Sequence, residues 1–161
     1  MQSSVFDKNS DELFMFEAIK QAKIAAAKDE VPVGAIIVHK GKVIARAHNQ
    51  IEMLKDPTAH AEMIAITQAA NFLGNKWLSG CSIYVTIEPC SMCAGALVLS
   101  RIDELIFGAH DLKTGACGSV VDITNNVKLN HAVAIRYGVL ADQCSGLLSD
   151  FFKKKREQGK K

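Results

Sequence analysis

The chain has 161 residues, of which 48% are hydrophobic and 22% are charged, and its formal net charge is +2 at pH 7. These values are ordinary for a soluble globular protein, and the length favours one domain with a single core. No apolar run approaches the roughly 20 residues of a membrane-spanning helix, and no basic region followed by an apolar stretch opens the chain, so we expect neither a membrane span nor a secretory signal. Five cysteines without the spacing of a disulfide framework favour a reducing compartment, and we expect the cytoplasm.

Apolar periodicity predicts helices and short β-branched runs predict strands along the whole chain. In chain order, we expect a capped helix at 10–28, strands at 33–39 and 42–47 joined as a hairpin, a loop at 51–57 and a helix from about 59 to 74. In the second half of the chain, we expect a strand at 82–87, a helix at 90–100, a strand at 104–107, a loop with several glycines at 108–119, a strand at 133–137 and a helix at 140–156. This alternation predicts a layered α/β domain with helices on both faces of the sheet.

Two short segments, 58–62 and 88–93, indicate a metal site. Cys90 and Cys93 form a Cys-x-x-Cys pair that brings two sulfurs onto one ion, and His60 is a third ligand of a type that zinc accepts. Three protein ligands leave a tetrahedral zinc ion with an open position for water, which indicates a catalytic ion. A lone Cys-x-x-Cys is also compatible with a redox pair or half of a structural zinc site, so this interpretation depends on the neighbouring His60 and Glu62.

Glu62 is the candidate catalytic acid–base. Zinc lowers the pKa of its water from about 15.7 to roughly 7, and a carboxylate beside the ion can take the proton and pass it to a substrate. Residues two apart point to nearly opposite sides of a helix, so His60 and Glu62 can both face the ion only near the first turn. We expect Thr58 or Asp56 to be the N-cap of this helix. The alternative for Glu62 is an ordinary surface position.

The pattern His-x-Glu followed by Pro-Cys-x-x-Cys is the signature of zinc deaminases. The resemblance extends beyond this signature. The chain resembles the bacterial tRNA-specific adenosine deaminase family in segments 30–35, 56–62, 85–96, 107–115 and 147–152.

The resemblance implies a three-layer α/β/α fold of the cytidine deaminase type with a five-stranded mixed sheet. It implies one zinc-dependent deaminase domain over residues 1–161, with one Zn²⁺ per subunit held by His60, Cys90 and Cys93. The implied reaction converts adenosine to inosine at the wobble position of a tRNA anticodon stem-loop, with Glu62 as the catalytic residue. The resemblance also implies a homodimer.

Further residues are candidates for contacts with the substrate. An amide such as Asn49 can bind a purine edge through both its donor and its acceptor, although the sequence alone favours a turn cap. The resemblance implies a substrate contact for Asn49, a pocket wall for Val31 and Pro32, and a backbone contact for Ala61. It also implies that Asp111 touches the nucleotide next to the target base, whereas a turn aspartate is the structural alternative.

The chain ends in a basic helix and tail at about 150–161. Phe151 and Phe152 are consecutive in a helix and cannot both face the same core, so one is expected to pack inward. The other could stack on a base or pack against a second subunit. The resemblance implies RNA contacts by Phe152, Lys153, Lys155 and Arg156, whereas the alternative for the tail is a solvated, fraying helix end.

Two other functional classes stay open. A deaminase of a free nucleobase or nucleoside, such as guanine, shares the zinc signature but needs no extended RNA surface, so the 111–115 stretch and the basic tail disfavour it. A zinc-stabilised RNA-binding module without catalysis would leave Glu62 and the open coordination position unexplained.

Overall fold

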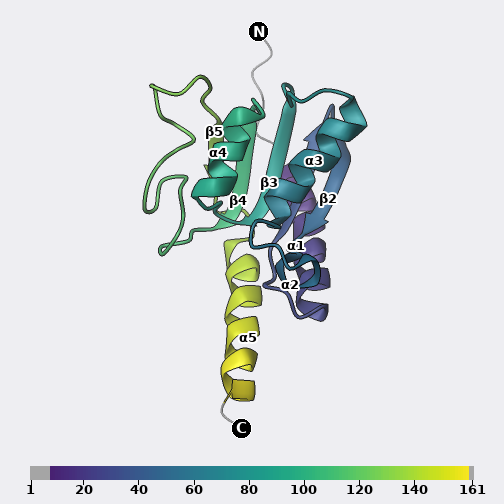
Figure 1. The fold of residues 1–161 in the computed structure, drawn as a ribbon, viewed down its shortest axis with the longest axis vertical. Coiled ribbons are helices and arrows are strands. Elements are labelled where there is room, and N and C mark those ends of the chain that lie inside the picture. Colours follow the sequence, from purple (N-terminus) through teal and green to yellow (C-terminus); the bar gives the residue numbers. More distant parts are fainter. Residues whose placement is uncertain (1–7, 160–161) are drawn as a thin grey trace.

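The computed structural model describes residues 8–159 (Figure 1). In chain order, its elements are α1 (Lys8–Ala27), β1 (Gly34–His39), β2 (Lys42–His48), α2 (Ile51–Leu54), α3 (Ala61–Leu73), β3 (Cys81–Ile87), α4 (Ser91–Leu99), β4 (Glu104–Ala109), β5 (Ala134–Tyr137) and α5 (Ala141–Gly159). Lys160 and Lys161, which were expected to extend the basic tail, lie outside the described residues. Within residues 8–159, no helix has the length and apolar character that a bilayer crossing requires.

The five strands form one mixed sheet in the order β2-β1-β3-β4-β5. β1 pairs antiparallel with both β2 and β3, whereas β3, β4 and β5 are parallel to one another. β2 and β3 therefore run in the same direction, and the segments that follow them start from the same edge of the sheet. The predicted five-stranded mixed sheet that begins with an antiparallel hairpin is confirmed.

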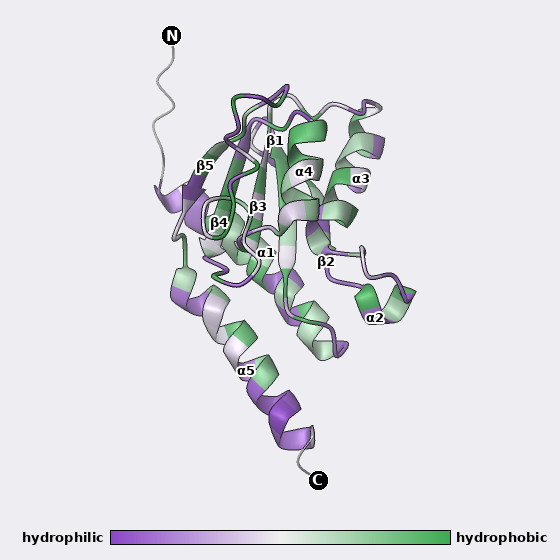
Figure 2. Cartoon of the chain, turned by 60° about the vertical axis from the view of Figure 1, so that its left-hand side comes forward, coloured by the Kyte–Doolittle hydropathy of each residue, from purple (hydrophilic) through white to green (hydrophobic). Residues whose placement is uncertain are grey.

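Helices cover both faces of this sheet. α1 and α5 pack on one face, through a cluster of buried residues that includes Met15, Ile36, Ile106 and Cys144. α3 and α4 pack on the other face, in front of the sheet in Figure 1, through a larger cluster that includes Ala65, Ile83, Leu97 and Leu105. The predicted three-layer α/β/α arrangement is confirmed. Figure 2 shows α5 extending past the sheet, with its hydrophilic residues gathered toward its C-terminal end.

A close approach of two backbones positions α1 on the sheet. A Cβ at Gly34 would come within 2.6 Å of the backbone nitrogen of Ala22 and closer still to the carbonyl oxygen of Ala18. Both alanines are fully buried. Only glycine lets the start of β1 lie directly against α1, because real Cβ atoms never come so near to backbone atoms.

The prediction of a loop at 51–57 was partly wrong, because the short helix α2 lies there. The buried carboxylate of Glu30 accepts hydrogen bonds from the N–H of Glu52 at 2.7 Å and from the N–H of Met53 at 3.2 Å. These N–H groups stand in the first turn of α2 and have no partner within the helix. A glutamate 22 residues upstream therefore stabilises α2, and local sequence patterns do not reveal such a partner.

The predicted start of α3 was also wrong. The helix begins at Ala61 with His60 as its N-cap residue, whereas Asp56 accepts hydrogen bonds from the N–H and hydroxyl of Thr58 in a turn before the helix. The N-terminal N–H of Ala61 donates instead to Oδ1 of Asn49, at 2.8 Å. The capping side chain thus comes from the end of β2.

Candidate metal centre and its cavity

His60 and Cys90 each stand immediately before a helix that starts at the same edge of the sheet. His60 is the N-cap of α3, with φ −74° and ψ 151°, and Cys90 is the N-cap of α4, with φ −73° and ψ 176°. The extended backbone at both positions leaves the two side chains at the helix ends. Cys93 follows in the first turn of α4 and is fully buried. The sequence prediction that the metal lies near first turns agrees with this arrangement.

The three side chains have the spacing of zinc ligands. Nδ1 of His60 lies 3.7 Å from Sγ of Cys90 and 3.6 Å from Sγ of Cys93. Zinc bonds of about 2.3 Å to sulfur and about 2.0–2.1 Å to nitrogen, at tetrahedral angles, would separate such atoms by about 3.6 Å. Within residues 8–159, these three form the one group of at least three His, Cys, Asp or Glu ligand atoms close enough to hold an ion. The donor set therefore fits zinc.

Hydrogen bonding prepares one of the thiols for a metal. The pKa of Cys90 is lowered to about 4, first because Cys93 and then because His60 hydrogen-bonds to its sulfur. The pKa of Cys93 is raised by its hydrogen bond to Cys90 and by burial, and the pKa of His60 is raised chiefly by its hydrogen bond to Cys90. The lowered pKa favours the thiolate form of Cys90, which is the form that binds metal.

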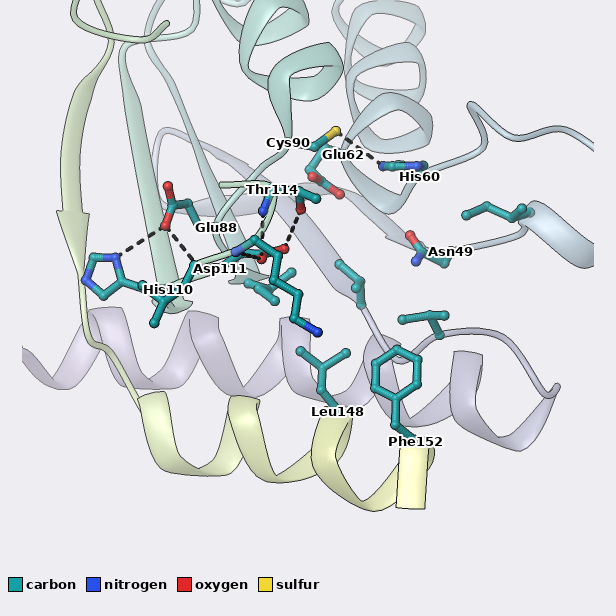
Figure 3. Close-up of a pocket in the computed structure, with 16 residues that line it drawn as sticks. Asn49, His60, Glu62, Glu88, Cys90, His110, Asp111, Thr114, Leu148 and Phe152 are labelled. Atoms are coloured by element: carbon teal, nitrogen blue, oxygen red, sulfur yellow. Dashed lines mark hydrogen bonds and ion pairs between the residues drawn. The ribbon is translucent and has the colours of Figure 1, made fainter. Parts of the chain in front are cut away.

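Glu62 is the second residue of α3, and its side chain is buried with only 3% of the residue exposed. Burial raises the pKa of its carboxyl group. Figure 3 shows Glu62, His60 and Cys90 gathered at one end of a cavity. A carboxyl group whose pKa moves toward neutrality can both take up and release a proton, as a general acid–base must.

The cavity has a volume of about 550 Å³. Its lining comes from the segment before β1, from the ends of β2, β3 and β4 with the segments that follow them, and from α5. It consists of Val31, Val33, Asn49, Ile51, His60, Glu62, Ile87, Glu88, Cys90, His110, Asp111, Leu112, Lys113, Thr114, Leu148 and Phe152. Among the predicted site residues, those that do not line it are Pro32, Ala61, Cys93, Lys153, Lys155 and Arg156.

Asn49 has a structural role beside its place in the cavity. Asn49 is only 5% exposed, and its Oδ1 atom caps α3 by accepting a hydrogen bond from the N–H of Ala61. The N–H of Ala61 is therefore engaged within the chain, and the backbone contact expected there stays a prediction. The side-chain amide of Asn49 still offers its nitrogen as a donor toward the cavity.

Asp111 forms a turn at the cavity wall. Its carboxylate accepts hydrogen bonds from the N–H of Lys113 at 3.0 Å, from the N–H of Thr114 at 3.1 Å and from the Thr114 hydroxyl at 2.7 Å. These bonds lower the pKa of Asp111 although burial acts to raise it. The turn-aspartate alternative thus describes its contacts within the chain, and its contact with a neighbouring nucleotide stays a prediction.

Sequence reasoning missed Glu88 as a site residue. Its side chain is fully buried and accepts hydrogen bonds from the N–H groups of Asp111, Cys117 and Ser119, each at 3.1 Å. The Ser119 hydroxyl donates to it as well. Burial acts to raise the pKa of Glu88, and these hydrogen bonds outweigh burial and lower it. Its position two residues before Cys90 was the available signal, but its partners are 23 to 31 residues away.

α5 brings two apolar residues to the cavity, Leu148 and Phe152, which are one helical turn apart. Phe152 is 45% exposed, whereas Phe151 is half-buried with its ring 5.5 Å from that of Phe152. Nζ of Lys155 lies 2.6 Å from a carboxylate oxygen of Asp29, just after α1. Lys153 and Arg156 follow Phe152 on α5 and are exposed.

Known proteins are similar to this chain over most of its length. A family model described as MafB19-like deaminase matches residues 8–156. A relative from Aquifex aeolicus (strain VF5), named tRNA-specific adenosine deaminase, is 54% identical over 145 residues, which are 90% of this chain and 95% of the relative. A relative of the same name from Bacillus subtilis (strain 168) is 48% identical over 150 residues, which are 93% of each chain.

Solved structures are similar as well. One, from a study of A-to-I editing by tRNA:A34 deaminases at the wobble position of transfer RNA, has a TM-score of 0.82 and 41% identity and covers 84% of this chain and 99% of its own. A guanine deaminase from Nitrosomonas europaea has a TM-score of 0.77 and covers 87% of this chain and 83% of its own. At 22% identity, that second likeness shows the fold alone.

Proposed function

The chain belongs to the family of tRNA-specific adenosine deaminases, and we propose that it hydrolyses adenosine to inosine at the wobble position of a tRNA anticodon. One observation carries the chemistry: three zinc-type ligands meet beside a buried glutamate at one end of a cavity. The overall reaction replaces the amino group at C6 of adenine with oxygen from water and releases ammonia.

His60, Cys90 and Cys93 would hold one Zn²⁺ per subunit. Zinc, when bound, would supply the Lewis acidity that lowers the pKa of a water to about 7. The chain supports this by lowering the pKa of Cys90 and by placing all three ligands at the starts of α3 and α4, where helix N-termini favour negative charge.

Glu62 would move the protons. It takes one from the attacking water, delivers a proton to N1 of the adenine ring, and then helps the amino group leave as ammonia. Its burial supports this role, because a carboxyl group with a raised pKa accepts a proton more readily near neutrality than an ordinary glutamate does. Asn49 would orient the purine through its side-chain amide, and Val31 would form part of the pocket wall.

The surroundings of the cavity suit RNA better than a free base. An anticodon loop presents unstacked bases, so its target base can enter a pocket at low cost. Phe152 at the cavity would stack on a base, and the exposed Lys153 and Arg156 would contact phosphates. Lys155 would do so after exchanging its ion pair with Asp29 for a phosphate.

We also propose that the active form is a cytoplasmic homodimer. Several apolar side chains are largely exposed in the single chain, among them Leu99 at 80% and Val127 at 96%, and a second subunit would cover such groups. The free cysteines support a reducing compartment. Light scattering of the purified protein tests the dimer, and a monomer at micromolar concentration would contradict it.

The function is tested by incubating the purified zinc protein with an adenosine-containing anticodon stem-loop, with free adenosine and with guanine. We expect inosine in the stem-loop and no conversion of the small substrates. Conversion of guanine alone would keep the zinc chemistry and overturn the RNA substrate.

Glu62→Ala tests the mechanism in the same assay. The variant should keep its zinc and lose turnover by a factor of about 10²–10⁴, because it lacks the buried carboxyl group that carries the proton beside the ligands. Turnover close to that of the wild type would contradict the role of Glu62.

A further inference from the structure

The wall of the cavity opposite α3 is a loop, residues 110–119, that is attached to the residues just before Cys90. Its first five residues, 110–114, line the cavity. The N–H of Ala116 donates to the carbonyl oxygen of Pro89 at 2.9 Å, and Ala116 is fully buried. The loop is therefore docked on the chain that leads into a metal ligand.

Glu88 is the centre of this attachment. Its Oε1 atom accepts from the N–H of Asp111, and Nδ1 of His110 lies 3.3 Å from the same oxygen. Its Oε2 atom accepts from the N–H groups of Cys117 and Ser119. One carboxylate thus binds both ends of the loop. Its side chain is fully buried, and its charge is compensated by N–H and hydroxyl donors.

The loop is shaped around this carboxylate. A Cβ at Gly115 would overlap the carboxylate of Glu88 and the carbonyl oxygen of Asp111. Gly115 itself donates its N–H to that carbonyl oxygen, at 2.9 Å. The glycine is therefore required by the closeness of Glu88 and not by a left-handed backbone.

Glu88 is not placed to act on the reacting atoms. Figure 3 shows its carboxylate turned toward His110 and Asp111 and away from Glu62. Its oxygens are occupied by the loop, and it is not part of the group that could hold a metal.

We propose that Glu88 is a positioning residue that holds the 110–119 loop in the register in which it binds the RNA substrate. This inference rests on the proposed function. In Glu88→Gln, an NH₂ group replaces one oxygen and faces N–H donors, so part of the loop must move away. The loop lines the cavity but carries neither a metal ligand nor the acid–base residue Glu62. A displaced loop should therefore weaken substrate binding more than it slows the chemical step.

The test compares Glu88→Gln and Gly115→Ala, which disturb the same contact from its two sides, with Glu104→Gln as the control. Glu104 is a partly buried glutamate that binds Arg136 at 3.0 Å and does not line the cavity. For each protein we measure zinc content, amide hydrogen exchange at Asp111, Cys117 and Ser119, and kcat and KM on the stem-loop.

Both test variants should keep their zinc, exchange these amides faster and show a KM raised about tenfold or more, with kcat changed much less. The control should match the wild type in KM and in loop exchange. An unchanged KM despite faster exchange would overturn the inference, and so would loss of zinc from both variants, since Glu88 would then support the metal site. If Glu88→Gln does not fold, Gly115→Ala carries the test.

The two proposals fail differently. A wild-type protein that converts no RNA overturns the proposed function and the role in substrate affinity together. An active wild type whose Glu88→Gln variant has normal KM overturns the role of Glu88 alone.

Discussion

Nδ1 of His60 lies 3.6 Å from Sγ of Cys93, although the two residues are 33 positions apart in the chain. The sheet brings them together, because β2 and β3 end at the same edge. β3 leads directly into the N-terminus of α4, and β2 leads through α2 to the N-terminus of α3. Open α/β sheets commonly bind their ligands at this edge. The candidate metal centre therefore depends on the fold as well as on its ligands, and single substitutions can change either one.

The first prediction concerns the ligands. Cys90→Ala should lower the zinc content from about one ion per chain to nearly none, because two remaining ligands bind zinc far more weakly than three. The measurement is metal analysis after dialysis. Cys144→Ala is the matched control, since Cys144 is also buried but lies in α5 against Gly108, and it should keep its zinc. A full equivalent of zinc in Cys90→Ala would contradict the ligand assignment.

The second prediction separates the two roles of Asn49. Asn49→Ala removes both the cap of α3 and the donor toward the cavity, so it should lower the free energy of unfolding by about 0.5–2 kcal/mol and raise KM. Asn49→Asp keeps the oxygen that accepts from Ala61 but loses the donor. It should therefore recover most of the stability, measured by urea unfolding, without recovering KM. If Asn49→Asp restored both, the donor would have no part in substrate binding.

Much of the fold followed from local patterns. The hairpin at β1 and β2, the four long helices and the two segments of the metal motif were visible because each depends on residues near one another in sequence. The ligand set needed only the short spacings around His60 and Cys90, and the structure brings these residues to ligand distance.

The errors share a cause in long-range contacts. α2 was missed because its cap is Glu30, and the start of α3 was misplaced because its cap is Asn49 rather than Asp56. Glu88 was missed because its partners lie in a loop beyond β4. In each case a buried side chain accepts hydrogen bonds from N–H groups 12 to 31 residues away. Local sequence patterns do not predict such long-range partners.

The third prediction is a pH dependence of the cavity wall. Hydrogen bonds from Thr114 and Lys113 lower the pKa of Asp111 in the folded chain below its value when unfolded, against the opposing effect of burial. The stabilisation by Asp111 is therefore complete above the unfolded pKa of about 3.9 and is lost as the pH falls through the folded pKa. Asp111→Asn, which cannot ionise, should lose less stability than the wild type between about pH 5 and pH 3. Urea unfolding at both pH values measures this, and equal losses in the two proteins would contradict it.

The fourth prediction tests the packing that supports the site. Gly34→Ala should lower the free energy of unfolding by about 1–3 kcal/mol or more, because the new Cβ overlaps backbone atoms of Ala18 and Ala22 that cannot rotate away. Gly146→Ala is the matched control: it lies inside α5 with open space around the position of a Cβ, so it should stabilise the protein by about 0.5–1 kcal/mol. Urea unfolding measures both changes.

Because α1 covers the sheet face opposite α3 and α4, Gly34→Ala should bind zinc normally wherever it remains folded. A Gly34→Ala protein as stable as the wild type would show that α1 can shift away from β1, and the close contact would then not be needed to hold the layers together.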